Sequence, residues 1–419
     1  MLPPFFLKNT ETADIYIYIL TGTLVSCLGV LFFFKYFNFV SESISDVLQL
    51  FAIQTHPITL NLLLPVGISF YTFQTLSYVI DVYRGEVPAE RHFGYYAAFV
   101  SFFPQLVAGP IERTRNLLPQ IKAQHEFDYT QASYGLKLMA WGFFKKLCVA
   151  DVLAVYVDAA YSSLRTQTGF ALLFAIFGFT IQIYCDFSGY SDIAIGTAKL
   201  FGIELMTNFD SPYFSCSIKE FWSRWHISLS TWFRDYVYIP LGGNRCGKLR
   251  HSANLLITFL VSGLWHGASW TFVIWGGIHG IAQIIENIFA NPLRQFRKTK
   301  IGHLLLLGAT FVFCSVAWTF FRAETFSDAI YVIAHALDGV TSGRHYFSNA
   351  VGLGYSSCMK IFCLVLLLAV YDFASLKTDV IVWLTSRHIF LRWTVYAVFI
   401  FIIFLFANIG NNSFIYFQF

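Results

Sequence analysis

Long apolar stretches recur along the chain and are separated by short polar segments. The clearest cover residues 15–34, 60–80, 134–157, 170–184, 269–289, 303–321, 357–373 and 390–408. Shorter or less regular stretches cover residues 93–109, 186–203 and 253–265. A helix needs about 20 predominantly apolar residues to cross a bilayer. The pattern therefore predicts about nine to eleven membrane helices, of which residues 253–265 are too short to cross alone and suit one half of a re-entrant pair.

The composition supports a membrane protein and argues against a soluble domain. Hydrophobic residues make up 56% of the 419 residues and charged residues 12%, whereas soluble proteins carry about 25% charged residues. This number of charged residues is too small to cover a water-facing surface for a chain of this length. Most of the surface must therefore face lipid. We find no internal repeat and no low-complexity linker, and we expect residues 1–419 to form one all-α domain.

Basic residues gather in short loops, and this bears on orientation. Residues 244–251 (NRCGKLRH) and 291–300 (NPLRQFRKTK) are short and basic, and such loops tend to be cytoplasmic. If both are, residues 253–289 enter the membrane and return, with a break at Trp265-His266-Gly267-Ala268. The net charge of +4 is modest and is not gathered on one surface, which argues against a nucleic-acid partner.

The termini and the cysteines give further expectations. Residues 1–14 are polar and lack the basic segment of a cleavable signal, so residues 15–34 are expected to act as an uncleaved span. The eight cysteines form no C-x-x-C pair, so we expect neither a metal site nor a disulfide framework. The chain also lacks a G-x-S-x-G elbow, a Walker A loop and a zinc spacing, which argues against a serine hydrolase, an ATP-driven pump and a zinc protease.

One segment, Ser217–Tyr236, has the period of an amphipathic helix that begins with a capping box of Ser217 and Glu220. At about 100° per residue its aromatic and aliphatic side chains share one arc. The opposite side carries Lys219, Ser223, His226, Ser230 and Arg234. Such a helix either anchors the protein at the membrane interface or lines a wet cavity in which His226 faces a substrate tunnel. Arg224 and Arg234 would suit an anionic phosphate or carboxylate nearby.

His266 is an ionisable residue within an apolar stretch, where burying it in the membrane costs free energy. It lies between Gly263 and Gly267, beside Trp265, and small residues let another backbone or a substrate chain come close. An ionisable group at membrane depth is a functional candidate by default. Burial favours the neutral imidazole, which can accept a proton from a hydroxyl. The alternative is a core histidine that is bonded to a backbone carbonyl.

Two carboxylates, Asp186 and Asp192, interrupt a run that is otherwise apolar. They need partners at this depth. One interpretation is structural pairing with basic groups or backbone amides, and the other is that they help to position a catalytic group.

Several stretches of the chain together have high specificity. They are FFKYFNF (33–39), LPVGISFYTFQTLSYVIDVYRG (64–85), FFPQLVAGPIER (102–113), WGFFKKLCVAD (141–151), CDFSGYSDIAIG (185–196), FWSRWHISLSTWFRDYVYIPLGGNR (221–245), GLWHGASWTFVIWGGIHG (263–280) and FIYFQF (414–419). Over nearly all of the chain from Phe33 they resemble the membrane-bound O-acyltransferase family, and most of all its bacterial alginate O-acetyltransferase branch.

The resemblance implies a polytopic helix bundle around a central tunnel, with re-entrant and amphipathic helices, that transfers an acyl group from a thioester to a hydroxyl. His266 matches the family histidine regarded as catalytic, and we expect it to act as the general base. His226 matches a second polar position across the site. With Asp186 or Asp192, it would orient the acceptor or stabilise the developing charge.

The resemblance also implies substrates, partners and a location. We expect acetyl-CoA as the donor with no bound cofactor or metal, and Arg224, Arg234 and Trp265 as substrate contacts. The acceptor would be an extracytoplasmic polysaccharide such as alginate, peptidoglycan or another exopolysaccharide. A periplasmic partner of the SGNH-hydrolase type would complete the transfer. The protein would cross a bacterial inner membrane several times.

The start of the chain departs from the family pattern. Only 32 residues precede Phe33, where the family usually has further apolar helices. Either the first spans are absent or the start lies earlier, so the N-terminal topology stays open.

Two rival functions are left open by the sequence. One is a D-alanyl transferase for teichoic acid that uses a carrier-protein thioester, against which the YIPLGGNR stretch favours the polysaccharide branch. The other is a transporter or flippase with a polar tunnel, which would move a substrate without acyl transfer.

Overall fold

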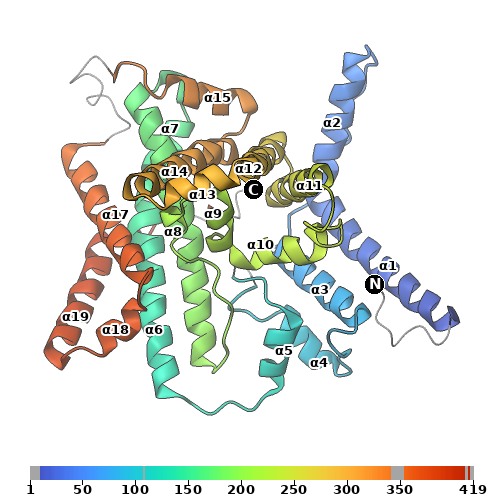
Figure 1. Cartoon of the computed structure of the whole chain (residues 1–419), viewed down its shortest axis with the longest axis horizontal. Helices are drawn as coiled ribbons and strands as arrows, with labels where there is room; N and C mark the ends of the chain where they lie inside the picture. The colour runs from blue at the N-terminus through green and yellow to red at the C-terminus, as the bar shows by residue number, and fades with distance from the viewer. Residues whose placement is uncertain (1–9, 107–108, 341–352, 411–413, 416–419) are drawn as a thin grey trace.

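The computed structural model describes residues 10–106, 109–340, 353–410 and 414–415, and these are helical apart from turns and extended connections, with no strand among them (Figure 1). The helices are α1 (Thr10–Leu31), α2 (Phe37–Leu50), α3 (Ile68–Tyr83), α4 (Phe93–Val100), α5 (Thr114–Lys122), α6 (Tyr129–Phe143), α7 (Asp151–Tyr161), α8 (Gly169–Leu200), α9 (Ile218–Arg224), α10 (Ile227–Phe233), α11 (Lys248–His266), α12 (Trp270–Ile288), α13 (Ala290–Arg297), α14 (Lys300–Arg322), α15 (Phe326–His335), α17 (Tyr355–Ser375), α18 (Val380–Thr385) and α19 (Ile389–Phe406). Single π-helical turns are η1 (Phe32–Tyr36), η2 (Phe144–Ala150) and η5 (Arg234–Tyr238), and 3-10 turns are η3 (Leu164–Thr166) and η4 (Pro212–Phe214).

The prediction of an all-α membrane protein with several spans is confirmed. Five helices of the described residues are long and apolar enough to cross a membrane, and a sixth crossing would be formed by α12 with α13, which bend by 81° at their junction. Figure 1 shows α17 and α19 at one edge and the arm formed by α1 and α2 at the other. The helices that carry the motifs of the sequence lie between these two edges.

Several predicted boundaries were wrong. Residues 170–184 and 186–203 were expected to form two elements, but α8 is one helix of 32 residues. Helix α3 begins at Ile68 and not near residue 60, because Gly67 has a positive φ of 74° and ends the preceding extended segment. Helix α4 has 8 residues where residues 93–109 suggested a longer element, and α11 has 19, more than residues 253–265 suggested.

Helices α6 and α8 touch backbone to backbone at glycines. A β-carbon on Gly142 would lie 2.6 Å from Gly189 O, and one on Gly135 would lie 2.5 Å from Gly196 O. The converse distances, from Gly189 to Gly142 O and from Gly196 to Gly135 O, are 2.8 Å and 2.5 Å. Small residues allow such close approach between membrane helices. The contact therefore fixes both the spacing and the register of the two helices.

Polar contacts join α6, α8 and α18 at one end of the bundle. The rings and side chains of α5, α6, α8 and α18 meet at one end, where Lys199 lies over Tyr134 and Tyr134 OH donates to Asp379. In Figure 1 this end, with α4, α5 and α18, is opposite α7 and α15.

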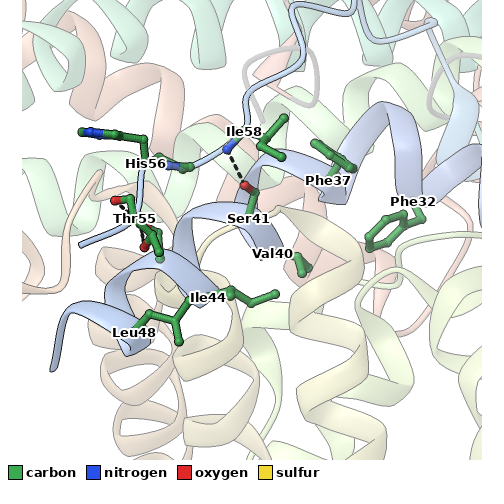
Figure 2. Close-up of a pocket in the computed structure, with 11 residues that line it drawn as sticks. Phe32, Phe37, Val40, Ser41, Ile44, Leu48, Thr55, His56 and Ile58 are labelled. Carbon is green, nitrogen blue, oxygen red and sulfur yellow. Dashed lines mark hydrogen bonds between the residues drawn. The ribbon is translucent and has the colours of Figure 1, made fainter. Parts of the chain in front are cut away.

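The arm of α1 and α2 is little buried: 6% of its most apolar 18-residue stretch is buried, compared with 72% for α8 and 0% for α19. Helix α2 is tied to the extended segment that follows it, because Ser41 Oγ accepts from Ile58 N at 2.8 Å and Ser45 Oγ donates to Thr55 O at 3.2 Å (Figure 2). A pocket of about 320 Å³ lies between them and is lined mainly by apolar side chains. The arm is thus braced locally at α2, and η1, between α1 and α2, contacts the end of α11 through Lys35.

The glycine contact predicts a position-dependent effect of one substitution. Gly142→Ala should destabilise the protein by about 1–3 kcal/mol, because the added methyl group meets the backbone of α8. Gly308→Ala in α14 is the matched control, since no atom lies within 4 Å of the added carbon. Thermal unfolding of the two detergent-purified variants measures the difference. Equal stability of both variants would show that the helices do not meet at Gly142.

Candidate functional site

Helices α11 and α12 form an antiparallel hairpin, and His266 is the last residue of its first arm. A β-carbon on Gly263 would lie 2.2 Å from Phe272 O, and one on Gly276 would lie 2.2 Å from Phe259 O. The chain extends at Gly267, and Ser269 caps α12 by accepting from Thr271 N. The predicted break after His266 is confirmed, because α11 ends there and α12 begins at Trp270. That residues 244–251 and 291–300 are cytoplasmic stays a prediction.

Lys35 holds the end of α11 from a position far away in the sequence. It lies in η1, and its Nζ donates to Trp265 O at 2.8 Å and to His266 O at 3.0 Å. The last carbonyls of a helix have no partner within the helix and carry the negative end of its dipole. A cation at this place satisfies them and fixes the backbone from which the His266 ring projects.

The segment predicted as one amphipathic helix over Ser217–Tyr236 is broken, which corrects the prediction. Helix α9 ends at Arg224 and α10 begins at Ile227, and His226 between them is left-handed, with φ 42° and ψ 55°. This conformation costs a residue other than glycine about 1–3 kcal/mol. Bonds to Asn208 offset the cost, since Ile227 N donates to Asn208 O at 2.9 Å.

Other parts of that prediction are confirmed. Ser217 Oγ accepts from Glu220 N at 3.1 Å, which is one of the two bonds of a capping box, while the Glu220 carboxylate accepts from Cys216 N at 3.1 Å in place of Ser217 N. The predicted apolar arc is buried at Ile218, Phe221, Trp222, Trp225, Leu229, Trp232 and Phe233. His226 was expected on the polar side, yet its exposed fraction is 0%. The left-handed turn rotates it inward, away from the exposed side chains of Lys219 and Ser223.

The structure brings the two histidines together in the interior. The ring centroids of His226 and His266 are 6.5 Å apart, and the exposed fraction of His266 is 3%. Aromatic rings enclose them: Phe70, Phe187, Phe209 and Trp265 around His226, and Trp265, Trp275 and Phe321 around His266. Burial disfavours the charged imidazolium, so this enclosure suits two neutral rings that exchange protons with a bound substrate.

Asp186 and Asp192 each form an ion pair with a lysine. Asp186 Oδ1 is 2.5 Å from Lys146 Nζ, and Asp186 Oδ2 accepts from Ile415 N at 2.8 Å. Asp192 Oδ2 is 2.6 Å from Lys145 Nζ. Both pairs lie between α8 and η2, directly beside the glycine contact. The geometry therefore favours the interpretation as structural pairs over a role in positioning a catalytic group.

The remaining predicted contacts differ in their surroundings. Arg224 pairs with Glu220 at 3.2 Å and with Asp210 at 3.6 Å, so its charge is already matched. Arg234 is exposed and bonds to the adjacent Asp235. Trp265 is buried, at 4% exposure, and its Nε1–H has no acceptor among the described residues. Because an indole N–H can only donate, Trp265 offers a free donor next to both histidine rings.

A pocket of about 530 Å³, lined by both polar and apolar side chains, opens beside α10 and the α11–α12 hairpin. Three basic side chains line it, namely Lys219, Arg234 and His251. The amides of Asn244, Gln283 and Asn287 and the hydroxyls of Ser223, Ser230, Thr231, Thr258 and Ser262 also line it. Helices α11 and α12 both contribute lining residues, from His251 to Ser262 and from Gln283 to Asn287. Within the described residues no group of three or more His, Cys, Asp or Glu side chains could hold a metal ion.

Sequence reasoning did not assign a role to Lys35 or to Asn208. Lys35 was part of a noted motif, and a lone lysine among phenylalanines is a signal of its own at membrane depth. Its partner, however, lies 230 positions away, and no spacing rule reports such a contact. Of the noted terminal stretch 414–419, residues 416–419 lie outside the described part of the chain.

The bonds of Lys35 predict a local loosening when its charge is removed. Lys35→Met should expose the last carbonyls of α11 and cost about 1.5–3 kcal/mol of stability, which is the range for a hydrogen bond to a charged group. Lys35→Arg keeps donors of the same charge and should lose less. Hydrogen exchange of the amides around residues 265–269 reads the effect directly. Unchanged exchange in Lys35→Met would rule out the anchoring role.

Comparison with known proteins adds the family. A model of the membrane-bound O-acyltransferase family matches residues 89–323, which is more than half of the chain. The chain is 46% identical to the probable alginate O-acetylase AlgI of Pseudomonas putida over 301 residues, covering 71% of this chain and 60% of that protein. It is 38% identical to the peptidoglycan O-acetyltransferase of Helicobacter pylori over 336 residues, covering 74% of this chain and 63% of that protein.

A more distant relative is the teichoic acid D-alanyltransferase of Streptococcus thermophilus, 30% identical over 278 residues, with 62% of this chain and 67% of that protein covered. The chain spans about 60% of the length of the alginate O-acetylase that it matches. The family match contains both histidines, the α9–α10 break and the α11–α12 hairpin. This chain belongs to the membrane-bound O-acyltransferase family.

Proposed function

We propose that this protein moves an acetyl group from a cytoplasmic thioester across the membrane toward the hydroxyls of an extracytoplasmic polysaccharide. The observation that carries the proposal is the pair of buried histidines with ring centroids 6.5 Å apart, in a chain whose family is defined by acyl transfer to hydroxyls. The names of its relatives, which include alginate and peptidoglycan O-acetyltransferases, support a polysaccharide as the acceptor.

In the proposed reaction His266 is the general base. Its neutral ring takes the proton of the acceptor hydroxyl while the oxygen attacks the thioester carbonyl. The tetrahedral intermediate then collapses, the carbon–sulfur bond breaks, and the leaving thiol takes the proton back from the imidazolium. Trp265 Nε1–H, which has no acceptor among the described residues, supplies a hydrogen bond to the carbonyl oxygen as negative charge develops there.

The polar pocket suits the donor. Acetyl-CoA carries phosphates and an arm with amide groups, and the pocket presents Lys219, Arg234 and His251 together with amide and hydroxyl side chains. Ser262, which lines the pocket, is one helical turn before His266 on α11. The basic loops beside the pocket favour the cytoplasmic side, where acetyl-CoA is available.

The acceptor side requires a partner in this proposal. The protein would lie in a bacterial inner membrane and pass the acetyl group to a periplasmic partner of the SGNH-hydrolase type, which would complete the modification of the polymer. The relatives of two polymer classes leave alginate, peptidoglycan and other exopolysaccharides as candidate acceptors. Transfer from a D-alanyl carrier protein in place of acetyl-CoA would instead indicate the teichoic acid activity named for the 30% identical relative.

The general-base role predicts the effect of removing His266. His266→Ala and His266→Gln should lower acetyl transfer from labelled acetyl-CoA by about 10²- to 10⁴-fold. Insertion and thermal unfolding should change little in His266→Gln, because glutamine nearly fills the same space. His388→Ala, at an exposed histidine before α19, is the control. Full transfer by both His266 variants would overturn the proposal.

The donor pocket predicts a change in KM. The double variant Lys219→Ala/Arg234→Ala should raise the KM for acetyl-CoA about tenfold with little change in kcat, because charge-assisted bonds to phosphate are lost equally from the ground state and the transition state. Arg387→Ala, an exposed basic residue outside the pocket, should leave KM unchanged. An unaltered KM in the double variant would place the donor elsewhere.

A further inference from the structure

Asn208 is the centre of a buried hydrogen-bond network beside His226. Its Oδ1 is 3.2 Å from Ser228 N, 2.8 Å from Ser228 Oγ and 3.0 Å from His226 Nδ1. Its Nδ2 donates to Ser191 Oγ on α8 at 3.1 Å. The exposed fractions of Asn208, Ser228 and Ser191 are 1%, 0% and 1%. Protein atoms therefore supply the hydrogen bonds that hold this amide.

The network decides which atom of the amide faces His226. A backbone N–H can only donate, so the Asn208 atom that meets Ser228 N must be the oxygen. The same oxygen faces His226 Nδ1, which therefore has to be the donor of that bond. A neutral imidazole carries one proton. With the proton on Nδ1, the lone pair of the ring is on Nε2.

The other nitrogen of His226 is left for a ligand. Nε2 is buried and has no hydrogen-bond partner among the described residues. Its ring packs edge-on against Phe187, with centroids 4.5 Å apart, and has Trp265 and His266 on other sides. A buried acceptor without a donor is costly, and a bound group with an O–H or N–H would remove that cost.

We propose that Asn208 is a positioning residue that fixes the Nδ1–H tautomer of His226, so that Nε2 accepts a hydrogen bond from the acceptor hydroxyl. The inference rests on the proposed function and divides the work of the two histidines. His226 holds the hydroxyl by its hydrogen and orients its oxygen toward the thioester carbon. It cannot stabilise the oxyanion in this state, because Nε2 has no proton to donate. The indole N–H of Trp265 is left for that task.

Two substitutions at position 208 separate tautomer control from packing. In Asn208→Leu the leucine is close to asparagine in size and has no hydrogen-bond acceptor. We expect kcat to fall at least about tenfold, because loss of the partner that fixes a catalytic histidine's tautomer lowers kcat in serine proteases. The KM for acetyl-CoA should change little. Asn208→Asp keeps an oxygen toward Nδ1 and Ser228 N and should retain most of the activity. Ser191→Ala, which removes only the partner of Nδ2, should behave like wild type. Equal losses in Asn208→Leu and Asn208→Asp would overturn the proposal.

A double-mutant cycle tests whether Asn208 acts through His226. In a His226→Gln background, Asn208→Leu should lower kcat no further, since the ring that it orients is gone. A purely structural role predicts that the two losses multiply, and that result would contradict the proposal. Thermal unfolding of each variant accounts for any loss of folded protein.

The protonation of the ring can be read without any acyl transfer. Nitrogen-15 NMR of histidine-labelled protein distinguishes protonated from unprotonated ring nitrogens. We expect a protonated Nδ1 and an unprotonated Nε2 for His226 in wild type, and a mixture in Asn208→Leu. The reverse tautomer in wild type would overturn the inference alone. A wild-type protein with the expected tautomer and no acetyl transfer would overturn the proposed function but not the tautomer assignment.

Discussion

Direct contact between helix backbones at glycines is the constraint on which the rest of the structure depends. In α6 with α8, and again in α11 with α12, an added β-carbon would lie 2.2–2.8 Å from a carbonyl oxygen of the other helix. At the first contact, the close approach brings two lysines of η2 to two aspartates of α8. At the second, it sets the end of α11 and hence His266. Small residues thus determine where the charged and polar residues meet.

Some polar groups of the interior are matched by specific partners, and others, such as Gln182 Oε1 and His279 Nε2, have no hydrogen-bond partner among the described residues. Water is absent from the hydrocarbon core, so unmatched groups are costly there. Lys35 meets two carbonyls, and Asn208 meets three donors. Two of the unmatched atoms, His226 Nε2 and Trp265 Nε1, belong to rings whose centroids are 6.2 Å apart. In the proposed reaction one is an acceptor and the other a donor, which is what a reacting hydroxyl and carbonyl require.

The sequence predicted the apolar helices, the hairpin and the place of His266 at its break because each depends on local composition and spacing. It failed at α8, where two aspartates suggested an interruption, because their lysine partners come from a different helix. It failed again at His226, where the helical period continued smoothly through Ser217–Tyr236. A left-handed turn at a residue other than glycine is stabilised by Asn208, and such a tertiary contact leaves no trace in the period of the chain.

The ion pairs between η2 and α8 have a consequence for how the protein is made. Each of Lys145, Lys146, Asp186 and Asp192 would cost about 2.5–3.5 kcal/mol at the centre of a bilayer if its helix left the translocon alone. The segments that carry them are consecutive in the chain and are joined by a connection at residues 162–168. If the two segments move from the channel into the membrane together, their ion pairs are already formed, and the charges are neutralised before they contact lipid. The two segments are therefore expected to enter the membrane as one unit, with the first waiting in the protein-conducting channel until the second has been synthesised.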